Sequence, residues 1–382
     1  MKLPIGINAA AKRIIKAAKK QEKIIIFGDS DLDGVASVVI LKELFEALNP
    51  LYSDIKIYFP NRELEGHGLS LQALEKYKDL TPALLFIVDC GSASGKEITK
   101  AKKMGYEVIV IDHHPLTGRA PKPHIFVNAW QKKDSYPFKQ FAAAGLVYLV
   151  AQKVLSKTKH PINEKLLEIT ALATLSDMMP LKEDNKELVN VGLDALLTTK
   201  RLGIKALIEL GDLDLENELD IFGGIIAPLN SAKLYNNLME SYELLVCEDF
   251  KKAKSLANRL IKQNKAKKEL VFQAVGEIGE RIKDKDSIIF ESSEYWPAAT
   301  LGVIASKLVQ KFKKPCFIFR MVGDEVVGSA RMPKDVDGVD ALKSCKDLLK
   351  TYGGHAPACG CRLDLKNLNK LEKCLNKYFK NL

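Results

Sequence analysis

The sequence predicts an α/β protein in which an N-terminal domain built on a parallel sheet is followed by a helical connector and a smaller C-terminal α/β domain with a mixed sheet. Up to about residue 115, short apolar runs alternate with helical patterns. From about 140 to 265 the pattern is mostly helical, and strand signals return near 285. Because 382 residues exceed what one hydrophobic core usually holds, we expect domains at 1–195, 196–267 and 268–382.

The N-terminal half contains the elements of the predicted parallel sheet. A basic amphipathic helix is expected in the first 20 residues. Strands are expected at 23–29, 54–60, 83–91 and 106–115, and helices at 34–48 and 96–105. Short apolar strands that alternate with helices are typical of parallel sheets, whose ligands bind at the carboxyl ends of the strands.

The second half begins with helices and ends with strands. Apolar helices are expected at 141–155 and 166–181, and a long basic helix at 250–278. Apolar runs at 286–292, 315–321 and 325–331 predict strands of the C-terminal domain.

Composition narrows the class of protein. A hydrophobic content of 47% and a charged content of 28% suit a soluble globular chain, and we expect no membrane span because no apolar run reaches eighteen residues. The net charge of +10 favours a polyanionic partner such as nucleic acid. The 7 cysteines lack zinc-type spacing, and a reducing cytoplasm is the expected compartment.

The stretch FGDSDLDGVAS, at 27–37, carries three aspartates at alternate positions: Asp29, Asp31 and Asp33. Carboxylates this close repel one another unless a positive group lies between them. A metal ion or a basic side chain would supply that charge. An aspartate at a strand end also commonly caps the next helix, so a purely structural role for Asp31 or Asp33 stays open.

Two further predicted strands also end in charged residues. Asp89 follows the strand near 83–91, and Asp112, His113 and His114 end the strand near 106–115. Because parallel strands have their carboxyl ends at one edge of the sheet, these side chains should meet Asp29 there. Each alone could be a cap or a packed histidine, but their joint occurrence favours a shared site.

The predicted cluster has the chemistry of a metal centre. Its members are Asp29, Asp31, Asp89, His113 and Asp177, the last in an otherwise apolar stretch. Carboxylate oxygens with imidazole nitrogens suit Mn²⁺, Mg²⁺ or Zn²⁺. Paired ions bridged by carboxylates serve attack on phosphate esters.

Four segments now point to a family. In chain order they are GDSDLDGVAS, VDCG, IDHHP and ATLSDMMPL. They resemble the four motifs of the DHH phosphoesterase superfamily. Within it, the motifs are most similar to those of RecJ-like single-strand-specific exonucleases. PNRELEGHGLS is also RecJ-like. LGVIASKLVQKFKKPCFIF, GDEVVGSARM and YGGHAPACGCRL resemble the DHH-associated C-terminal domain. The resemblance covers nearly the whole chain.

The resemblance implies a role for each residue of the cluster. Asp29, Asp31, Asp89, His113 and Asp177 would bind two Mn²⁺ ions, with Mg²⁺ or Co²⁺ as alternatives, and hydrolysis would use both ions.

Two neighbouring residues would assist in catalysis. His114 would act at the scissile phosphate or the leaving oxygen, and Asp112 would orient an imidazole. Asp33 would lie just outside the metal ligands.

The C-terminal domain would hold substrate. Ser329 and Arg331 offer a hydroxyl and a guanidinium fork that suit a phosphate. Gly353 and Gly354 would let a ligand approach the backbone closely, and His355 adds a hydrogen-bond donor.

Substrate contacts are also expected from the N-terminal half, where the sequence departs from the family. Arg62 lies in the loop after the second strand. RecJ-like chains have a PRxNAAGR segment, whereas IAPLNSAKLYN here keeps Asn230 but lacks both arginines, so Lys233 would replace one charge. The sequence ends soon after the GGH segment, and we expect no OB-fold.

The leading hypothesis is a RecJ-like 5′-to-3′ exonuclease on single-stranded DNA, with RNA as a further substrate. A 3′-to-5′ exonuclease or a nanoRNase-like hydrolase of short oligonucleotides stays open. The basic connector and the GSAR–GGH domain argue against a further alternative, an inorganic pyrophosphatase. A non-catalytic replication or repair scaffold would have lost metal ligands, and here every ligand position is filled. A helicase or another replication or repair protein is the expected protein partner, and homo-oligomers stay open.

Overall fold

A computed structural model describes residues 3–52, 54–116, 118–158, 163–283 and 287–380. The chain forms two compact units, with limits at Met1–Asn264 and Lys265–Leu382. The boundary between them falls inside one long helix, α12 (Phe250–Arg281). No helix in the described ranges combines the length and the apolarity needed to cross a bilayer.

The N-terminal unit is built on a parallel sheet with the strand order β2-β1-β3-β4-β5. Its strands are β1 (Ile24–Gly28), β2 (Ile55–Tyr58), β3 (Ala83–Val88), β4 (Tyr106–Ile111) and β5 (Ile125–Val127). The four strands expected from the sequence are confirmed. The short fifth strand was missed.

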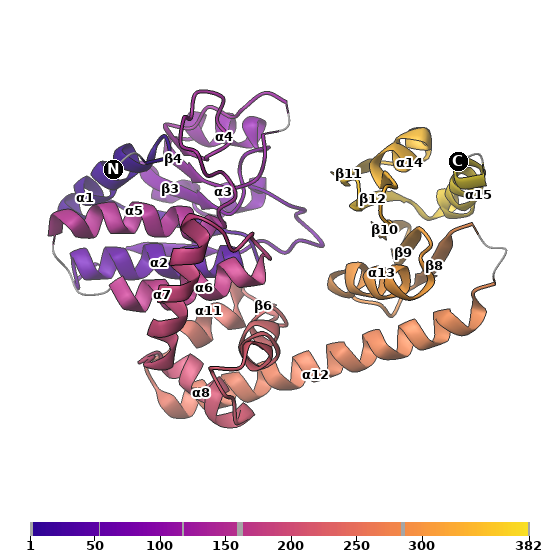
Figure 1. The fold of residues 1–382 in the computed structure, drawn as a ribbon. Coiled ribbons are helices and arrows are strands. Elements are labelled where there is room, and N and C mark those ends of the chain that lie inside the picture. The colour runs from indigo at the N-terminus through magenta and orange to yellow at the C-terminus, as the bar shows by residue number, and fades with distance from the viewer. Residues whose placement is uncertain (1–2, 53, 117, 159–162, 284–286, 381–382) are drawn as a thin grey trace. The chain divides into compact units, whose positions relative to one another are not determined.

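Helices cover both faces of this sheet, which is why its strands are apolar throughout. Along β1, Ile24 and Ile26 face a core shared with α1 (Ile7–Lys20), α2 (Leu32–Leu48), α5 (Ala143–Thr158) and α6 (Asn163–Ser176). Ile25 and Phe27 face a second core with α3 (Leu71–Lys76) and α4 (Gly95–Lys103). Figure 1 shows α1, α5 and α2 stacked on one another.

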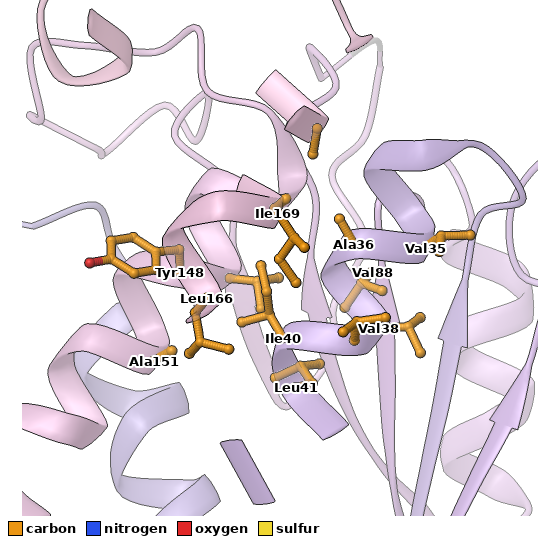
Figure 2. Packing of buried hydrophobic residues seen from close by; sticks show 14 of the residues in the cluster. Val35, Ala36, Val38, Ile40, Leu41, Val88, Tyr148, Ala151, Leu166 and Ile169 are labelled. Atoms are coloured by element: carbon orange, nitrogen blue, oxygen red, sulfur yellow. The ribbon is translucent and has the colours of Figure 1, made fainter. Parts of the chain in front are cut away.

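The core between α2, α5 and α6 holds the site-bearing helices in place. Val38, Ile40, Tyr148, Leu166 and Ile169 are all buried within it (Figure 2). At about 25 cal/mol per Å² of buried apolar surface, such side chains each contribute about 1.5–3 kcal/mol, so the ends of these helices have little freedom to move.

The remaining elements of this unit extend the same core. They are α7 (Asp184–Leu197), α8 (Leu202–Gly211), α9 (Glu218–Asp220), a π-helical turn (Ile221–Ile226), α10 (Ala227–Leu229), the hairpin β6 (Leu234–Tyr235) and β7 (Leu238–Met239), and α11 (Glu240–Leu245). Buried residues of α8, α11 and the first half of α12 belong to that core, so the segment expected to be a connector packs onto the parallel-sheet domain.

The C-terminal unit has a mixed sheet with the strand order β11-β12-β10-β9-β8, in which β8 and β9 are parallel and the other pairs antiparallel. Its elements are β8 (Ile289–Ser293), α13 (Ala298–Phe312), β9 (Cys316–Val322), β10 (Glu325–Arg331), α14 (Gly338–Ser344), β11 (Thr351–His355), β12 (Ala358–Asp364) and α15 (Leu368–Lys380). The mixed sheet is confirmed. The β11–β12 hairpin was not predicted.

One covalent link was also not foreseen. Cys345, just after α14, forms a disulfide with Cys374 of α15. The two are separated by 29 positions in sequence, and packing of α14 against α15 on one face of the sheet brings them together. Sequence spacing alone cannot reveal such a pair.

Candidate metal centre

The carboxyl ends of three neighbouring strands carry the predicted cluster. Gly28, Val88 and Ile111 are paired across β1, β3 and β4, so the residues that follow them leave the same edge of the sheet. These are Asp29, Asp89 and Asp112. Since both aspartates after β1 and β3 are buried, their charges need a partner.

His113 lies at the centre of the acids. Its Nε2 is 3.4 Å from Asp89 Oδ1, 3.6 Å from Asp177 Oδ2 and 3.9 Å from Asp33 Oδ2. Burial lowers the pKa of His113 to about 4, and the neighbouring His114 adds to this effect. The imidazole is therefore neutral near pH 7, the form that binds a metal ion.

Possible ligand atoms gather in three overlapping groups, within each of which all such atoms lie within 4.8 Å of one another. The groups are Asp29–Asp31–Asp89, Asp33–His113–Asp177 and Asp89–His113–His114. The structure thus brings together all five residues expected to bind metal.

Local backbone geometry aims the acids at this point. Asp31 caps α2 by accepting from the Gly34 N–H (3.2 Å). Asp33 accepts from the N–H groups of Ala143 (2.7 Å) and Ala144 (2.8 Å) at the start of α5. The expected capping of the next helix is therefore present for Asp31, whereas Asp33 lies inside α2 and binds the start of α5. Asp89 adopts a left-handed φ of 59°, which turns its chain sharply after β3.

Asp177 is positioned by a helix end that the sequence placed too late. The predicted helix over 166–181 ends at Ser176, and Met178 beyond it is 86% exposed. One oxygen of Asp177, Oδ2, is buried and has no hydrogen-bond partner among the described residues. Burial raises the pKa of Asp177 to about 6, and the charge of Asp31 adds to this. An orphaned buried oxygen among carboxylates is what a bound cation would satisfy.

A basic side chain lies between the first two aspartates. Arg62 Nε–H donates to Asp29 Oδ1 (2.6 Å), and its Nη2 donates to Asp31 Oδ2 (2.7 Å). Arg62, predicted to contact substrate, pairs with these two carboxylates in the structure, and its contact with substrate stays a prediction.

Asp112 and His114 form a second, connected arrangement. His114 Nδ1–H donates to Asp112 Oδ1 (2.7 Å), and this bond raises the pKa of His114 to about 9. Burial acts to raise the pKa of Asp112, but the bonds from His114 and the Ser92 N–H outweigh it and lower this pKa to about 2. The imidazole of His114 is 54% exposed. It is held in one orientation and charged near neutral pH.

Asn230 and Lys233 were expected to bind substrate. Asn230 lies near the start of α2, and Lys233 lies on the surface. Asn230 Oδ1 accepts from the Leu32 N–H (3.1 Å), and its amide donates to Ser176 Oγ (2.7 Å). It therefore touches the residues that flank Asp31 and Asp177. The side chain of Lys233 is exposed.

Four of the five predicted substrate residues of the C-terminal unit share one face of its sheet, whereas Gly354, which pairs with Cys359, falls on the other face. Ser329 and Gly353 both pair with Gly360, and Arg331 and His355 both pair with Ala358. The Arg331 guanidinium donates to Ser329 Oγ (3.1 Å) and lies against Gly302 of α13, where a side chain would collide with it. The glycines and His355 of β11 are exposed.

Comparison with known proteins now decides the family. Residues 23–174 match the DHH family N-terminal domain, and residues 285–381 match the DHHA1 domain. The chain is 32% identical over 384 residues to the single-stranded-DNA-specific exonuclease RecJ of Bacillus subtilis. This chain is a RecJ-like member of the DHH superfamily.

The RecJ-like chain spans only part of several relatives. It aligns over 98% of its own length with 48% of the B. subtilis protein, and over 97% with 68% of RecJ from Haemophilus influenzae, at 28% identity. Its fold matches a crystal structure of exonuclease RecJ bound to manganese, with a TM-score of 0.87, 24% identity and coverage of 100% and 96%. RecJ from Thermus thermophilus in complex with Mn²⁺ also gives 0.87, at 23% identity, with coverage of 100% and 56%. These structures establish the fold.

One residue that supports the RecJ-like site was missed by sequence reasoning. Asn128, fully buried just after β5, donates to Ser92 Oγ (2.9 Å) and to the carbonyl of His114 (2.9 Å). Together with Asp112, these bonds fix both the ring and the backbone of His114. Because β5 was not foreseen, nothing in the sequence placed Asn128 beside the histidines.

Proposed function

We propose that this chain is a divalent-metal-dependent phosphodiesterase that digests single-stranded DNA from one end, 5′ to 3′, with two metal ions. The carrying observation is the convergence of Asp29, Asp31, Asp89, His113 and Asp177 at one sheet edge. The relatives named above are single-stranded-DNA-specific exonucleases, and RecJ structures contain Mn²⁺ or Mg²⁺. A basic chain with a net charge of +10 suits a polyanionic substrate.

The donor set fits hard divalent cations. Carboxylate oxygens with one neutral imidazole are ligands of Mn²⁺ and Mg²⁺, and Asp177 Oδ2 is an unsatisfied oxygen among them. Both oxygens of Asp33 already accept N–H bonds from α5, so we assign Asp33 a supporting role. Divalent ions there would act as Lewis acids on a phosphoryl oxygen and make water a better nucleophile.

His114 would hold a proton at the reacting phosphate. Asp112 fixes the Nδ1–H, so the opposite nitrogen, Nε2, is free to point toward the half-exposed side of the ring. With its raised pKa, His114 carries a proton that can bond a phosphoryl oxygen or pass to the leaving oxygen. Asn128 keeps this histidine in place.

In the DHHA1 domain, a substrate phosphate would be bound by Ser329 and Arg331. The exposed backbone at Gly353 and Gly354 and the side chain of His355 would add further contacts. Asn230 and Lys233 would lie along the path of the strand in the DHH domain. The proposal includes a cytoplasmic location. It also includes delivery of the substrate by a helicase or by another replication or repair protein.

A single gel tests the proposal. Purified protein with Mn²⁺ is incubated with a single-stranded DNA oligonucleotide labelled at its 3′ end, alongside Asp89→Asn and the matched surface variant Asp194→Asn. We expect a descending ladder of labelled fragments from wild type and Asp194→Asn, and intact substrate from Asp89→Asn or with EDTA.

Other patterns on the gel would change the assignment. Immediate release of a labelled mononucleotide would mean attack from the 3′ end. Cleavage of dinucleotides alone would mean a short-oligonucleotide hydrolase. No cleavage of DNA, RNA or dinucleotides with Mn²⁺ bound would contradict an enzymatic role and favour a scaffold.

A further inference from the structure

The guanidinium of Arg62 occupies the place of a cation in one of the three potential ion-binding groups. Asp29, Asp31 and Asp89 form that group, and Arg62 contacts the first two at 2.6 and 2.7 Å. Asp29 Oδ1, which accepts from Arg62, also accepts from the Ser30 N–H (2.8 Å). The carboxylate oxygens that face Arg62 are therefore engaged in this structure.

The loop that carries Arg62 is anchored independently of its side chain. The Pro60 carbonyl accepts from Ser30 Oγ (2.7 Å), and Glu65 accepts from the Asn61 N–H (2.8 Å) and the Tyr58 hydroxyl (2.8 Å). Between Asn61 and Glu65, Leu64 is 78% exposed. None of these anchoring bonds uses the Arg62 side chain, so they would persist if its guanidinium moved.

Electrostatics explain why the guanidinium of Arg62 lies between these carboxylates. Burial opposes its charge, but Asp29 and Asp31 together raise its pKa above the ordinary value. In return, the guanidinium lowers the repulsion between the two carboxylates. A divalent cation bound by the same oxygens would repel a guanidinium at ion-pair distance, and strongly so where water is scarce.

We propose that Arg62 is the resident counter-ion of the metal-free site and leaves the carboxylates when divalent ions bind, which frees its fork for a substrate phosphate. This inference rests on the proposed metal-dependent function. It couples two events, because a guanidinium released by the metal can bind phosphate through two parallel hydrogen bonds. Without metal, Arg62 is committed to Asp29 and Asp31.

Chemical modification reads the position of this side chain directly. Phenylglyoxal attacks arginines whose guanidinium is accessible and not held in ion pairs, and peptide mass mapping reports each site separately. We expect saturating Mn²⁺ to speed modification of Arg62 at least about fivefold, the low end of measured couplings. Arg13, paired with Glu22 and Glu107, should stay slow, and exposed Arg119 should stay fast.

Calorimetry on the same samples separates the two possible failures. An unchanged or slower rate at Arg62 while calorimetry shows bound Mn²⁺ would overturn this inference and leave the proposed function standing. Absence of Mn²⁺ binding in calorimetry would overturn both.

Variants give a second, independent test. Arg62→Ala should melt at a lower temperature in EDTA, because Asp29 and Asp31 lose their counter-ion, yet bind Mn²⁺ at least about fivefold more tightly. Arg62→Lys keeps the charge and should stay near wild type in melting temperature. Arg281→Ala removes a comparable two-bond pair with Glu291 and should leave Mn²⁺ affinity unchanged. Wild-type or weaker Mn²⁺ affinity in Arg62→Ala would refute the counter-ion role, and if that variant does not fold, the modification rates decide.

Discussion

Replacing Arg201 with methionine should destabilise the DHH domain more than any change at an exposed charge. Arg201 lies immediately before α8, at its N-cap position, and its side chain is 2% exposed. It donates to Glu43 of α2 (2.8 and 3.1 Å) and to Glu168 of α6 (2.9 Å). It also donates to the carbonyls of Leu245 (2.7 Å) and Lys165 (3.0 Å).

The size of the effect follows from what the substitution leaves behind. Methionine fills the space of the arginine stem but removes the guanidinium from two buried carboxylates, and loss of one partner of a buried ion pair costs about 3–5 kcal/mol. In a domain of this size that corresponds to a fall in melting temperature of roughly 10 °C. Lys165 also contacts Glu43 (3.0 Å) but is 52% exposed, so Lys165→Met should cost less than about 1 kcal/mol.

Urea unfolding followed by tryptophan fluorescence measures this difference. The chain has two tryptophans, Trp130 and Trp296, one in each compact unit, so a Trp296→Phe background reports on the DHH domain alone. Adding Glu43→Gln and Glu168→Gln to Arg201→Met should restore part of the loss, because a buried amide costs less than an unpaired carboxylate. A loss below about 1 kcal/mol in Arg201→Met would refute the reasoning from buried charge.

Three further outcomes are expected. Asp89→Asn keeps the shape of a side chain that tolerates left-handed backbone. It should lower turnover more than about 100-fold, beyond what the hydrogen-bond partners of metal ligands usually contribute, while the far-ultraviolet circular dichroism stays that of wild type. Retained turnover would contradict the role of Asp89 as a ligand. Asn128→Ala should lower turnover about 10–100-fold and broaden the NMR signal of His114 without reducing Mn²⁺ affinity in calorimetry; a purely structural role would instead appear as lost stability with normal turnover in the folded fraction. Cys345→Ser should lower the unfolding free energy of the C-terminal unit by about 2–4 kcal/mol in urea. A reductant should lower that of the wild type by the same amount and leave the variant unchanged. Equal unfolding free energies of the variant and the non-reduced wild type would mean that Cys345 and Cys374 are unpaired in solution.

The sequence predicted the parts of the site that depend on strand ends. Asp29, Asp89 and His113 follow strongly apolar strands, and parallel pairing brings strand ends together whatever the intervening loops do. Asp177 was identified by its motif, but the helix before it was extended too far, because exposed Met178 looked like part of an apolar face.

The remainder depended on tertiary contacts that leave no local pattern. The strand β5 is three residues long, too short for a periodic signal, so Asn128 stayed hidden. The β11–β12 hairpin is rich in glycine and lacks apolar alternation in β11. That Arg62 faces Asp29 is a property of where two separate loops meet, which spacing along the chain does not record.

The edge strand β11 has a thermodynamic consequence for recognition. Among the strands that the structure describes it lies at the edge of the sheet and pairs with β12, and all of Thr351–His355 is exposed. Glycines within a strand weaken it, because they lose more backbone entropy than other residues and bring no side chain to pack. Such a segment opens locally at a small fraction of the global unfolding free energy. A ligand that orders it must offset that entropy from its own contacts, and would therefore bind β11 less tightly than a strand that is already rigid.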